Sequence, residues 1–310
     1  MATIEIVGDL NGTPGAKDVM QQLVVSWQPG HTVWVARGLS LEGPRRPLLA
    51  RSADVRIRWG LKGAQAGEWV VVPNVGATAP SIPSGIDVIT LSVRARKVLE
   101  QTASHQTVHV LPLPIPDQFY APGDRALVWD ATQSLRLEER PRIVYAGSYT
   151  DGSEMSHVLD AASRLLVSGG ELLLLDGLPL RARLAPVVHH LGLADKVIFT
   201  PTLTMDLLAG VYHGADILIG GNADRLFPVA AHYAMAAGLP VIGWHTPLME
   251  DLTGRGALFV HNDKMWKEAI VEVLENGRIR ERMIERGLAY AKERHLRDVA
   301  DTWLSTIGVG

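Results

Sequence analysis

Short runs of apolar residues alternate with longer segments of helical periodicity along the whole chain. In the first part these runs are rich in Val and Ile and lie at residues 4–7, 32–36, 54–58, 68–72, 87–91 and 107–111. The second part has corresponding runs at residues 142–147, 171–177, 196–199, 216–220, 240–243 and 257–260. Short apolar runs separated by helices are typical of parallel strands with crossover helices. The pattern therefore predicts an α/β protein with parallel sheets.

The polar and apolar positions also predict where the main helices lie. Residues 15–27 carry apolar side chains at positions 19, 20, 23, 24 and 27, which fall on one helical face. The stretch "RLFPVAAHYAMAAGLPVIG" (225–243) predicts a helix, a stop at Gly238 and a buried strand. Residues 263–307 predict continuous helix with breaks at Gly277, at Gly287 and around His295, and no further strand.

A proline-rich segment divides the two parts. "PLPIPDQFYAPGD" (112–124) holds four prolines, which a parallel sheet does not accommodate. We predict a first Rossmann-like domain over residues 1–120, a linker over 121–141, a second Rossmann-like domain over 142–292 and a C-terminal helix over 293–310. Open sheets of this class bind ligands beyond the carboxyl ends of their strands, so we expect a ligand in a cleft between the two domains.

Composition narrows the function classes. The net charge of −3 gives no field that attracts nucleic acid or an anionic membrane surface, so we expect neither as a partner. The chain has no cysteine, which excludes disulfides, cysteine-ligated zinc, iron–sulfur clusters and thiol nucleophiles. No apolar stretch reaches the roughly 18 residues that span a bilayer, and the first residues do not resemble a secretory signal. We expect a cytoplasmic protein without a transmembrane segment.

Candidate binding residues lie in the loops after the predicted strands. Asn11, Gly12 and Gly15 follow the first strand, where small residues permit close approach of a ligand or simply form a tight turn. His245 and Glu250 follow the strand at 240–243 and form either a proton-transfer pair or part of a solvated loop. No catalytic residue is identified, and the chain has neither a GxSxG elbow nor a GxxxxGK[ST] phosphate loop.

We expect no metal cofactor. His189, His190 and His232 are the histidines that invite a metal site, but no acidic or histidine partner recurs near them at ligand spacing.

Several motifs of the second part occur together in one known family. They include "VYHGAD" (211–216) before a predicted strand and "AMAAGLPVI" (234–242). In order and spacing, residues 142 to about 300 resemble the nucleotide-sugar-binding domain of retaining glycosyltransferases with the GT-B architecture (GT4-like). The resemblance implies two Rossmann-like domains facing a cleft, a C-terminal helix crossing back to the first domain, a nucleotide-sugar ligand and no required metal.

The first part resembles the same family more weakly. "DVITLSVRARKVLE" (87–100) is similar to the closing segment of the acceptor domain, and "LNGTPGAKD" (10–18) is similar to its glycine loop. Residues 37–86 are shorter than the family usually has, and they offer no obvious counterpart of the acceptor-domain histidine. If the tail crosses back, the residues expected to dock it are Leu288, Tyr290, Val299, Trp303 and Leu304.

The donor-binding side chains of the family are replaced in this sequence. In the family, an arginine and a lysine bind the donor diphosphate. The resemblance aligns these two residues with Ser148 and Ser153. The resemblance also aligns two glutamates of the family, eight residues apart, with Arg225 and Tyr233. Leu226 and Phe227 complete this donor loop, and Pro228 stands where a glycine is expected. Glu250 matches a glutamate that is common in another loop of the family.

Each replacement has a functional and a structural interpretation. Arg225 binds an acidic sugar or phosphate, or it is a surface arginine. Tyr233 stacks on a base or ribose, or it packs in the core. Ser148 and Ser153 each offer one weak phosphate contact, or they are ordinary loop serines.

Two functional hypotheses follow from these replacements. In the first, the chain is a catalytically degenerate glycosyltransferase-like module for binding or assembly, with a partner glycosyltransferase or a second copy of itself. In the second, it is a divergent but active retaining glycosyltransferase that moves a sugar from a nucleotide-sugar donor without a metal.

Overall fold

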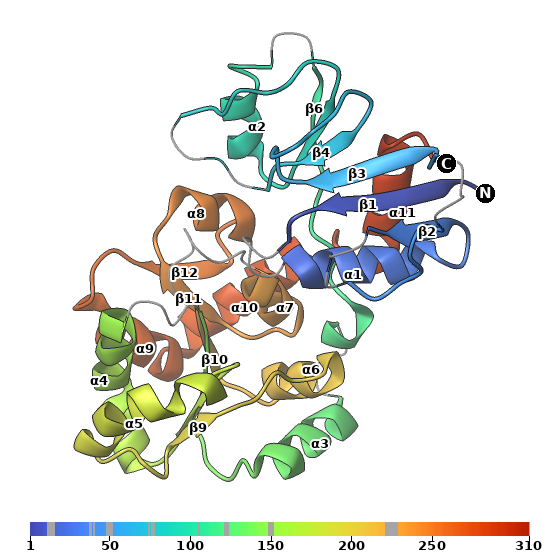
Figure 1. Cartoon of the computed structure of the whole chain (residues 1–310). Helices are drawn as coiled ribbons and strands as arrows, with labels where there is room; N and C mark the ends of the chain where they lie inside the picture. The colour runs from blue at the N-terminus through green and yellow to red at the C-terminus, as the bar shows by residue number, and fades with distance from the viewer. Residues whose placement is uncertain are drawn as a thin grey trace. The chain divides into compact units, whose positions relative to one another are not determined.

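The computed structural model divides the chain into two compact units (Figure 1). It describes residues 1–310 except 11–15, 37–38, 40, 48–51, 74, 76–77, 104–105, 121–123, 148–151, 221–228 and 310, and except the side chains of 152–154 and 248. The first unit comprises Met1–Pro114 together with Glu293–Gly310, and the second comprises Ile115–Lys292. The segment 293–310, predicted as a separate C-terminal helix, thus belongs to the first unit.

A six-stranded parallel sheet forms the centre of the first unit, in the order β2-β1-β3-β4-β5-β6. Its members are β1 (Thr3–Gly8), β2 (Thr32–Val35), β3 (Val55–Trp59), β4 (Trp69–Val71), β5 (Asp87–Thr90) and β6 (Val108–Val110). All six strands overlap the apolar runs that predicted them. Ile4 pairs with Val33 on one side and Val55 on the other, and Ile4 is fully buried.

Two helices from opposite ends of the chain pack together in this unit. Helix α1 (Ala16–Trp27) buries the apolar face predicted from its sequence, and helix α11 (Leu296–Thr306) lies beside it. The Trp27 and Trp303 rings are 6.5 Å apart. Trp27 donates its indole N–H to the Ala300 carbonyl, and Trp303 donates its own to Pro112, both at 3.2 Å. Burial of the tail and these bonds fix the last helix to the first unit.

Irregular links connect β2 to β5 in the described part of the first unit. In the described parts of the links from β2 to β5, no α-helix is present. Instead Arg58 bonds Glu68, with 2.6 Å between Nε and Oε2, and the Gln65 amide donates to the same carboxylate. Burial alone would raise the pKa of Glu68, but these donors outweigh burial and hold its pKa below the ordinary value. Helix α2 (Val93–Leu99) follows β5, with Ser92 as its N-cap.

The second unit is a doubly wound parallel sheet in the order β12-β11-β10-β7-β8-β9. Its strands are β7 (Arg142–Ala146), β8 (Glu171–Leu174), β9 (Val197–Phe199), β10 (Ile217–Gly220), β11 (Val241–Trp244) and β12 (Ala257–Val260). One face is covered by α4 (Gly152–Ser168), α5 (Arg181–His190) and α9 (Met265–Glu275). The other face is covered by α6 (Met205–His213), α7 (Val229–Ala236) and α10 (Gly277–Ala291). Because helices cover both faces, whole strands such as "ELLL" are buried.

The remaining elements of this unit are short or lie outside its two layers. They are the 3₁₀ turns η1 (Asp117–Phe119) and η2 (Leu178–Leu180), helix α3 (Arg125–Leu135) and helix α8 (Pro247–Thr253). Helix α3 lies in the predicted linker, but it packs on α6 as part of the second unit. Gly210 permits that packing, because a Cβ there would lie 2.1 Å from the Leu127 carbonyl oxygen.

The predicted break at Gly287 is wrong. Helix α10 runs without interruption from Gly277 to Ala291. A Cβ on Gly287 would lie 3.2 Å from the Cβ and Cγ atoms of Met235, so the glycine allows α10 to approach α7 closely. The breaks near residues 277 and 295 are confirmed, and Gly238 ends α7 with a φ of +71° as predicted.

The predicted docking of the tail is partly wrong. Val299 and Trp303 are buried in the first unit, as expected. Leu288 is 38% exposed, and Tyr290 contacts His232 of α7 within the second unit.

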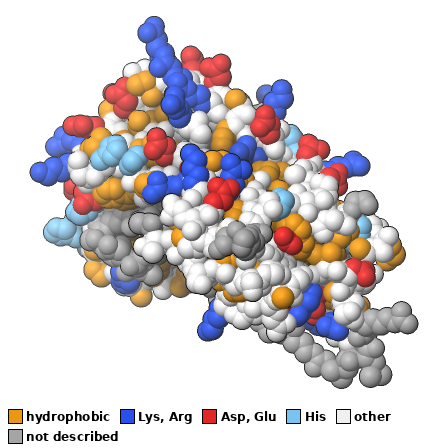
Figure 2. All heavy atoms as spheres, turned by 90° about the horizontal axis from the view of Figure 1, so that it is seen from above, with side chains coloured by type: hydrophobic (Ala, Val, Ile, Leu, Met, Phe, Trp, Pro, Cys, Tyr) orange, Lys and Arg blue, Asp and Glu red, His pale blue; other side chains and the backbone are white. Residues whose placement is uncertain are grey.

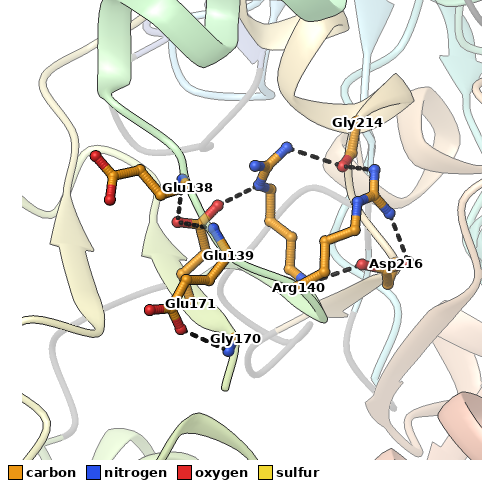
Figure 3. Close-up of polar contacts among 8 residues, drawn as sticks. Glu138, Glu139, Arg140, Gly170, Glu171, Gly214 and Asp216 are labelled. Atoms are coloured by element: carbon orange, nitrogen blue, oxygen red, sulfur yellow. Dashed lines mark hydrogen bonds and ion pairs between the residues drawn. The ribbon is translucent and has the colours of Figure 1, made fainter.

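Charged residues hold the amino ends of the second sheet together. We call this cluster the amino edge, and its members are Glu139, Arg140, Arg142, Glu171, Lys196, Gly214 and Asp216. Figure 3 labels five of them, namely Glu139, Arg140, Glu171, Gly214 and Asp216. Arg142 pairs with Glu171, and its backbone N–H donates to Asp216 at 2.7 Å. Both Arg140 and Arg142 donate to the Gly214 carbonyl, at 2.8 and 3.0 Å. These bonds join β7, β8 and the start of β10.

Two observations concern the helices and the surface of the described part of the chain. No described helix is both long enough and apolar enough to cross a membrane. On the face drawn in Figure 2, basic and acidic side chains lie interspersed.

Candidate functional site

The expected ligand edge of the second unit is the set of segments that follow the strands, which we call the carboxyl edge. Only part of the predicted donor site can be placed there. Ser148, Arg225, Leu226 and Phe227 lie outside the described residues, as do Asn11, Gly12 and Gly15 in the first unit. Ser153 lies in the first turn of α4, and its side chain is not described. Tyr233, His245 and Glu250 are the candidates with described side chains.

Tyr233 lies in the core and not on the ligand edge. Its side chain is 1% exposed and stacks on Phe119 of η1, with ring centroids 4.4 Å apart and an interplanar angle of 22°. Phe119 also contacts Tyr212 of α6, at 6.0 Å between centroids. Seven of the eight residues of helix α7 are buried, and Tyr233 is one of them. The burial agrees with the packing interpretation of Tyr233 and leaves its ring no free face for a nucleotide.

Tyr212 completes this aromatic cluster on the side of α6. Burial raises the pKa of its phenol, and the negative charge of Asp176 raises it further. Phe119, Tyr212 and Tyr233 thus form an uncharged group at the place where the family resemblance expects a carboxylate.

His232, the neighbour of Tyr233, joins three helices. Its Nε2 lies 2.5 Å from the Leu252 carbonyl oxygen of α8 and 3.4 Å from the Tyr290 hydroxyl of α10. It is 1% exposed. His189 and His190 are exposed at the end of α5. Among the side chains that the structure describes, no three His, Asp or Glu residues lie together as a metal-binding group.

His245 and Glu250 are brought together at the carboxyl edge. The Nε2 of His245 lies 3.4 Å from Oε2 of Glu250, and their side chains are 33% and 60% exposed. Thr246 caps α8 by accepting a bond from the Met249 amide at 3.1 Å, and Pro247 occupies the first turn. The cap sets where α8 begins and thereby places Glu250 beside His245. An exposed pair of this kind can bind a polar ligand and exchange a proton with it.

A second histidine belongs to this group and was missed from the sequence. His261 follows β12, and its ring lies 4.5 Å from the His245 ring. The register of β11 with β12 pairs Trp244 with Val260, which puts the two following residues side by side. The apolar runs at 240–243 and 257–260 could have predicted this contact. If they are taken as neighbouring parallel strands, His261 falls beside His245.

A surface hollow of about 740 Å³ lies between α4 and the start of α9. His157 and Asp263 form an ion pair across it at 3.1 Å. The residues that line it are His157, Asp160, Ala161, Asn262, Asp263, Lys264 and Lys267.

Comparison with known sequences gives matches over about half of the chain. The family model "Glycosyl transferases group 1" matches residues 129–289. A D-inositol 3-phosphate glycosyltransferase of Mycobacteroides abscessus is 30% identical over 165 residues, which are 50% of this chain and 36% of that protein. A 2-deoxystreptamine glucosyltransferase of Streptomyces kanamyceticus is 27% identical over 174 residues, 54% of this chain and 45% of that protein. The chain matches less than half the length of these relatives.

Comparison with solved structures extends to both units. WaaG, a glycosyltransferase involved in lipopolysaccharide biosynthesis, has a TM-score of 0.71 and 13% identity, covering 99% of this chain and 100% of that one. The Anabaena protein Alr3699/HepE in complex with UDP-glucose has a TM-score of 0.72 and 15% identity, with the same coverage. The paired Rossmann-like sheets therefore have the GT-B architecture, and the chain belongs to the glycosyl transferases group 1 family.

Proposed function

We propose that this chain is a catalytically degenerate member of its family that serves as a binding or assembly module. The observation that carries the proposal is the position of Tyr233. By the family resemblance this position holds a glutamate that binds the nucleotide ribose, whereas here a buried tyrosine stacks on Phe119. A buried, stacked phenol thus stands where a ribose-binding carboxylate is expected.

The sequence at the other donor positions supports the same proposal. Ser148 and Ser153 replace the two cations that would bind the donor diphosphate, and Arg225 replaces the second glutamate. A hydrogen bond to a charged group contributes about 1.5 to 3 kcal/mol. Loss of two such groups weakens the binding of a diphosphate by roughly 3 to 6 kcal/mol, or two to four powers of ten in affinity.

The alternative is a divergent, metal-independent retaining glycosyltransferase. Its support is the complete GT-B fold, shared with an Anabaena protein that was crystallised with UDP-glucose. A relative named as a D-inositol 3-phosphate glycosyltransferase supports it as well. In this alternative Arg225 takes over part of the donor contact, since a guanidinium suits phosphate or an acidic sugar.

Ligand titration separates the two functions. We would follow the melting temperature of the chain with UDP, UDP-glucose, GDP-mannose and ADP-glucose, with the Anabaena protein as a positive control. A ligand that binds the native state stabilises it by mass action. The proposal expects no shift with any sugar nucleotide at about 1 mM, a concentration at which a micromolar ligand is near saturation.

A transfer assay provides the second readout. We would incubate the chain with the same donors and with D-inositol 3-phosphate, and detect product by mass spectrometry. Turnover that is lost in Arg225→Ala would refute the degenerate function and establish the alternative. Light scattering over a range of protein concentrations, alone and with a glycosyltransferase partner from the same cell, tests the assembly role. We propose a cytoplasmic location, which cell fractionation tests.

A further inference from the structure

Two histidines from neighbouring strands lie ring against ring at the carboxyl edge of the second sheet. The centroids of His245 and His261 are 4.5 Å apart, with 34° between the ring planes. The His245 amide donates to the Val260 carbonyl at 2.8 Å and continues the pairing of β11 with β12 by one residue. The backbone therefore places the two residues side by side at the ends of neighbouring strands.

The Phe259 ring meets the His245 ring edge to face, at 5.6 Å and 84°, and supports it from the side of β12. His245 keeps a third of its side-chain surface, and His261 is exposed. Both rings are thus held in place and open to solvent.

The charge state of such a pair depends on what lies beside it. Two imidazolium ions at this distance repel each other, so full protonation of the pair is unfavourable in the absence of an anion. A bound anion that accepts an N–H from each ring offsets the repulsion, because charge-assisted hydrogen bonds to phosphoryl oxygens are strong. Anion binding and proton uptake are therefore coupled at this pair.

Charged groups of both signs occur on the segments that follow β11 and β12 and on α4 in the described residues. Glu250 of α8 lies 3.4 Å from Nε2 of His245. On the other side, Asp263 is paired with His157, and Asp160 lies farther along the hollow. Lys264 and Lys267 line the same hollow and add positive charge. A second charge on the rings is thus left for a ligand to compensate.

We propose that His245 and His261 form an anion subsite for the phosphoryl group of a phosphorylated ligand. The inference rests on the proposed function in one respect, the loss of the inherited cations at positions 148 and 153. The subsite supplies positive charge from a different pair of strands, and this charge is lost as the pH rises through the range of about 5 to 8, where imidazole gives up its proton.

The test is calorimetric titration with inorganic pyrophosphate at pH 6 and pH 8, in two buffers with different heats of ionisation. We expect pyrophosphate to bind about tenfold more tightly at pH 6 than at pH 8, because one charge-assisted bond is lost at pH 8. We also expect net proton uptake on binding. A phosphoryl ligand gains negative charge as the pH rises, so its own ionisation produces the opposite trend.

Variants connect the pH dependence to the two rings. His245→Asn/His261→Asn is expected to abolish both the pH dependence and the proton uptake. His189→Asn/His190→Asn, at two exposed histidines of α5, is the matched control and keeps both. Binding that is flat with pH, rises with pH or retains its pH dependence in the first double variant overturns the proposal.

Two further ligands identify the source of the phosphoryl group. UDP stands for a donor diphosphate, and glucose 6-phosphate stands for a phosphorylated acceptor. The ligand whose binding is tighter and depends on the two rings gives the source, and ring-independent binding of both refutes the subsite. Sugar transfer together with ring-dependent pyrophosphate binding would refute the proposed function and leave the subsite intact.

Discussion

The two edges of the second sheet hold their charges in opposite ways. At the amino edge the side chains of Arg142 and Glu171 are each 6% exposed, and several bonds from three strands converge on them. At the carboxyl edge His245 and Glu250 are 33% and 60% exposed and meet through one contact of 3.4 Å. The amino edge maintains the fold, whereas side chains at the carboxyl edge can change without cost to it. The proposed replacement of the donor residues therefore requires no change in the bonds of the amino edge.

The largest expected effect is at the amino edge. Arg142→Met leaves the Glu171 carboxylate buried without its main partner, and we expect a loss of about 3 to 5 kcal/mol in the free energy of unfolding, measured with urea. Arg140→Met is the control, because Arg140 is 56% exposed, and its loss should stay below about 1 kcal/mol. The double change Arg142→Met/Glu171→Leu should recover much of the loss. Equal losses for Arg142→Met and Arg140→Met would contradict the special role of the buried pair.

The next effect tests whether Tyr233 belongs to the core or to the carboxyl edge. Tyr233→Glu removes the ring stacked on Phe119 and buries a carboxylate, so we expect a loss of about 3 kcal/mol in urea unfolding. Tyr233→Phe keeps the ring and should cost less than about 1.5 kcal/mol. If Tyr233→Glu instead melts like the unchanged chain and binds UDP more tightly, the side chain reaches the ligand edge and the comparison fails.

A smaller effect depends on pH. The hydrogen bond from Lys196, with help from the Gly170 amide, holds the pKa of Glu139 below its ordinary value of 4.5. A depressed pKa in the folded state gives stability that is present above pH 4.5 and is lost as the pH falls through the folded value. The melting temperature of Glu139→Gln should therefore lie slightly below that of the unchanged chain at pH 7, and the difference should disappear near pH 3. A difference that grows on acidification would show that Glu139 acts by another route.

The smallest effect is expected at the carboxyl edge itself. Glu250→Gln keeps the shape of an exposed side chain, so its effect on urea unfolding should stay within about 0.5 kcal/mol. A loss above 1 kcal/mol would mean that this edge also carries stability, and the contrast between the edges would be weaker than we infer.

Much of the fold was predictable because buried parallel strands leave a direct trace in the sequence. "ELLL" and "VIGW" are almost wholly buried, so an apolar run and a strand coincide. Gly287 was mispredicted because the local propensity of glycine indicates a break, whereas the contact with Met235 requires a glycine inside the helix. Tertiary contacts decided that position, and a single sequence does not contain them.

The candidate site was less predictable for a similar reason. His245 and Glu250 were found because they follow one strand, but His261 required the register between two strands. The stacking of Phe119 on Tyr233 joins residues far apart in sequence, and no local pattern predicts it. Whether Arg225 and the two loop serines bind a ligand stays a prediction, since their side chains lie outside the described residues.

The bond from Trp303 to the Pro112 carbonyl has a consequence for biosynthesis. The ribosome makes the first sheet early, but the helix that covers part of it emerges only after the entire second unit has been translated. The half that is synthesised first is therefore completed last, and its nascent form leaves Trp27 uncovered for most of translation. A premature stop after residue 292 would damage the oldest part of the polypeptide before the newest.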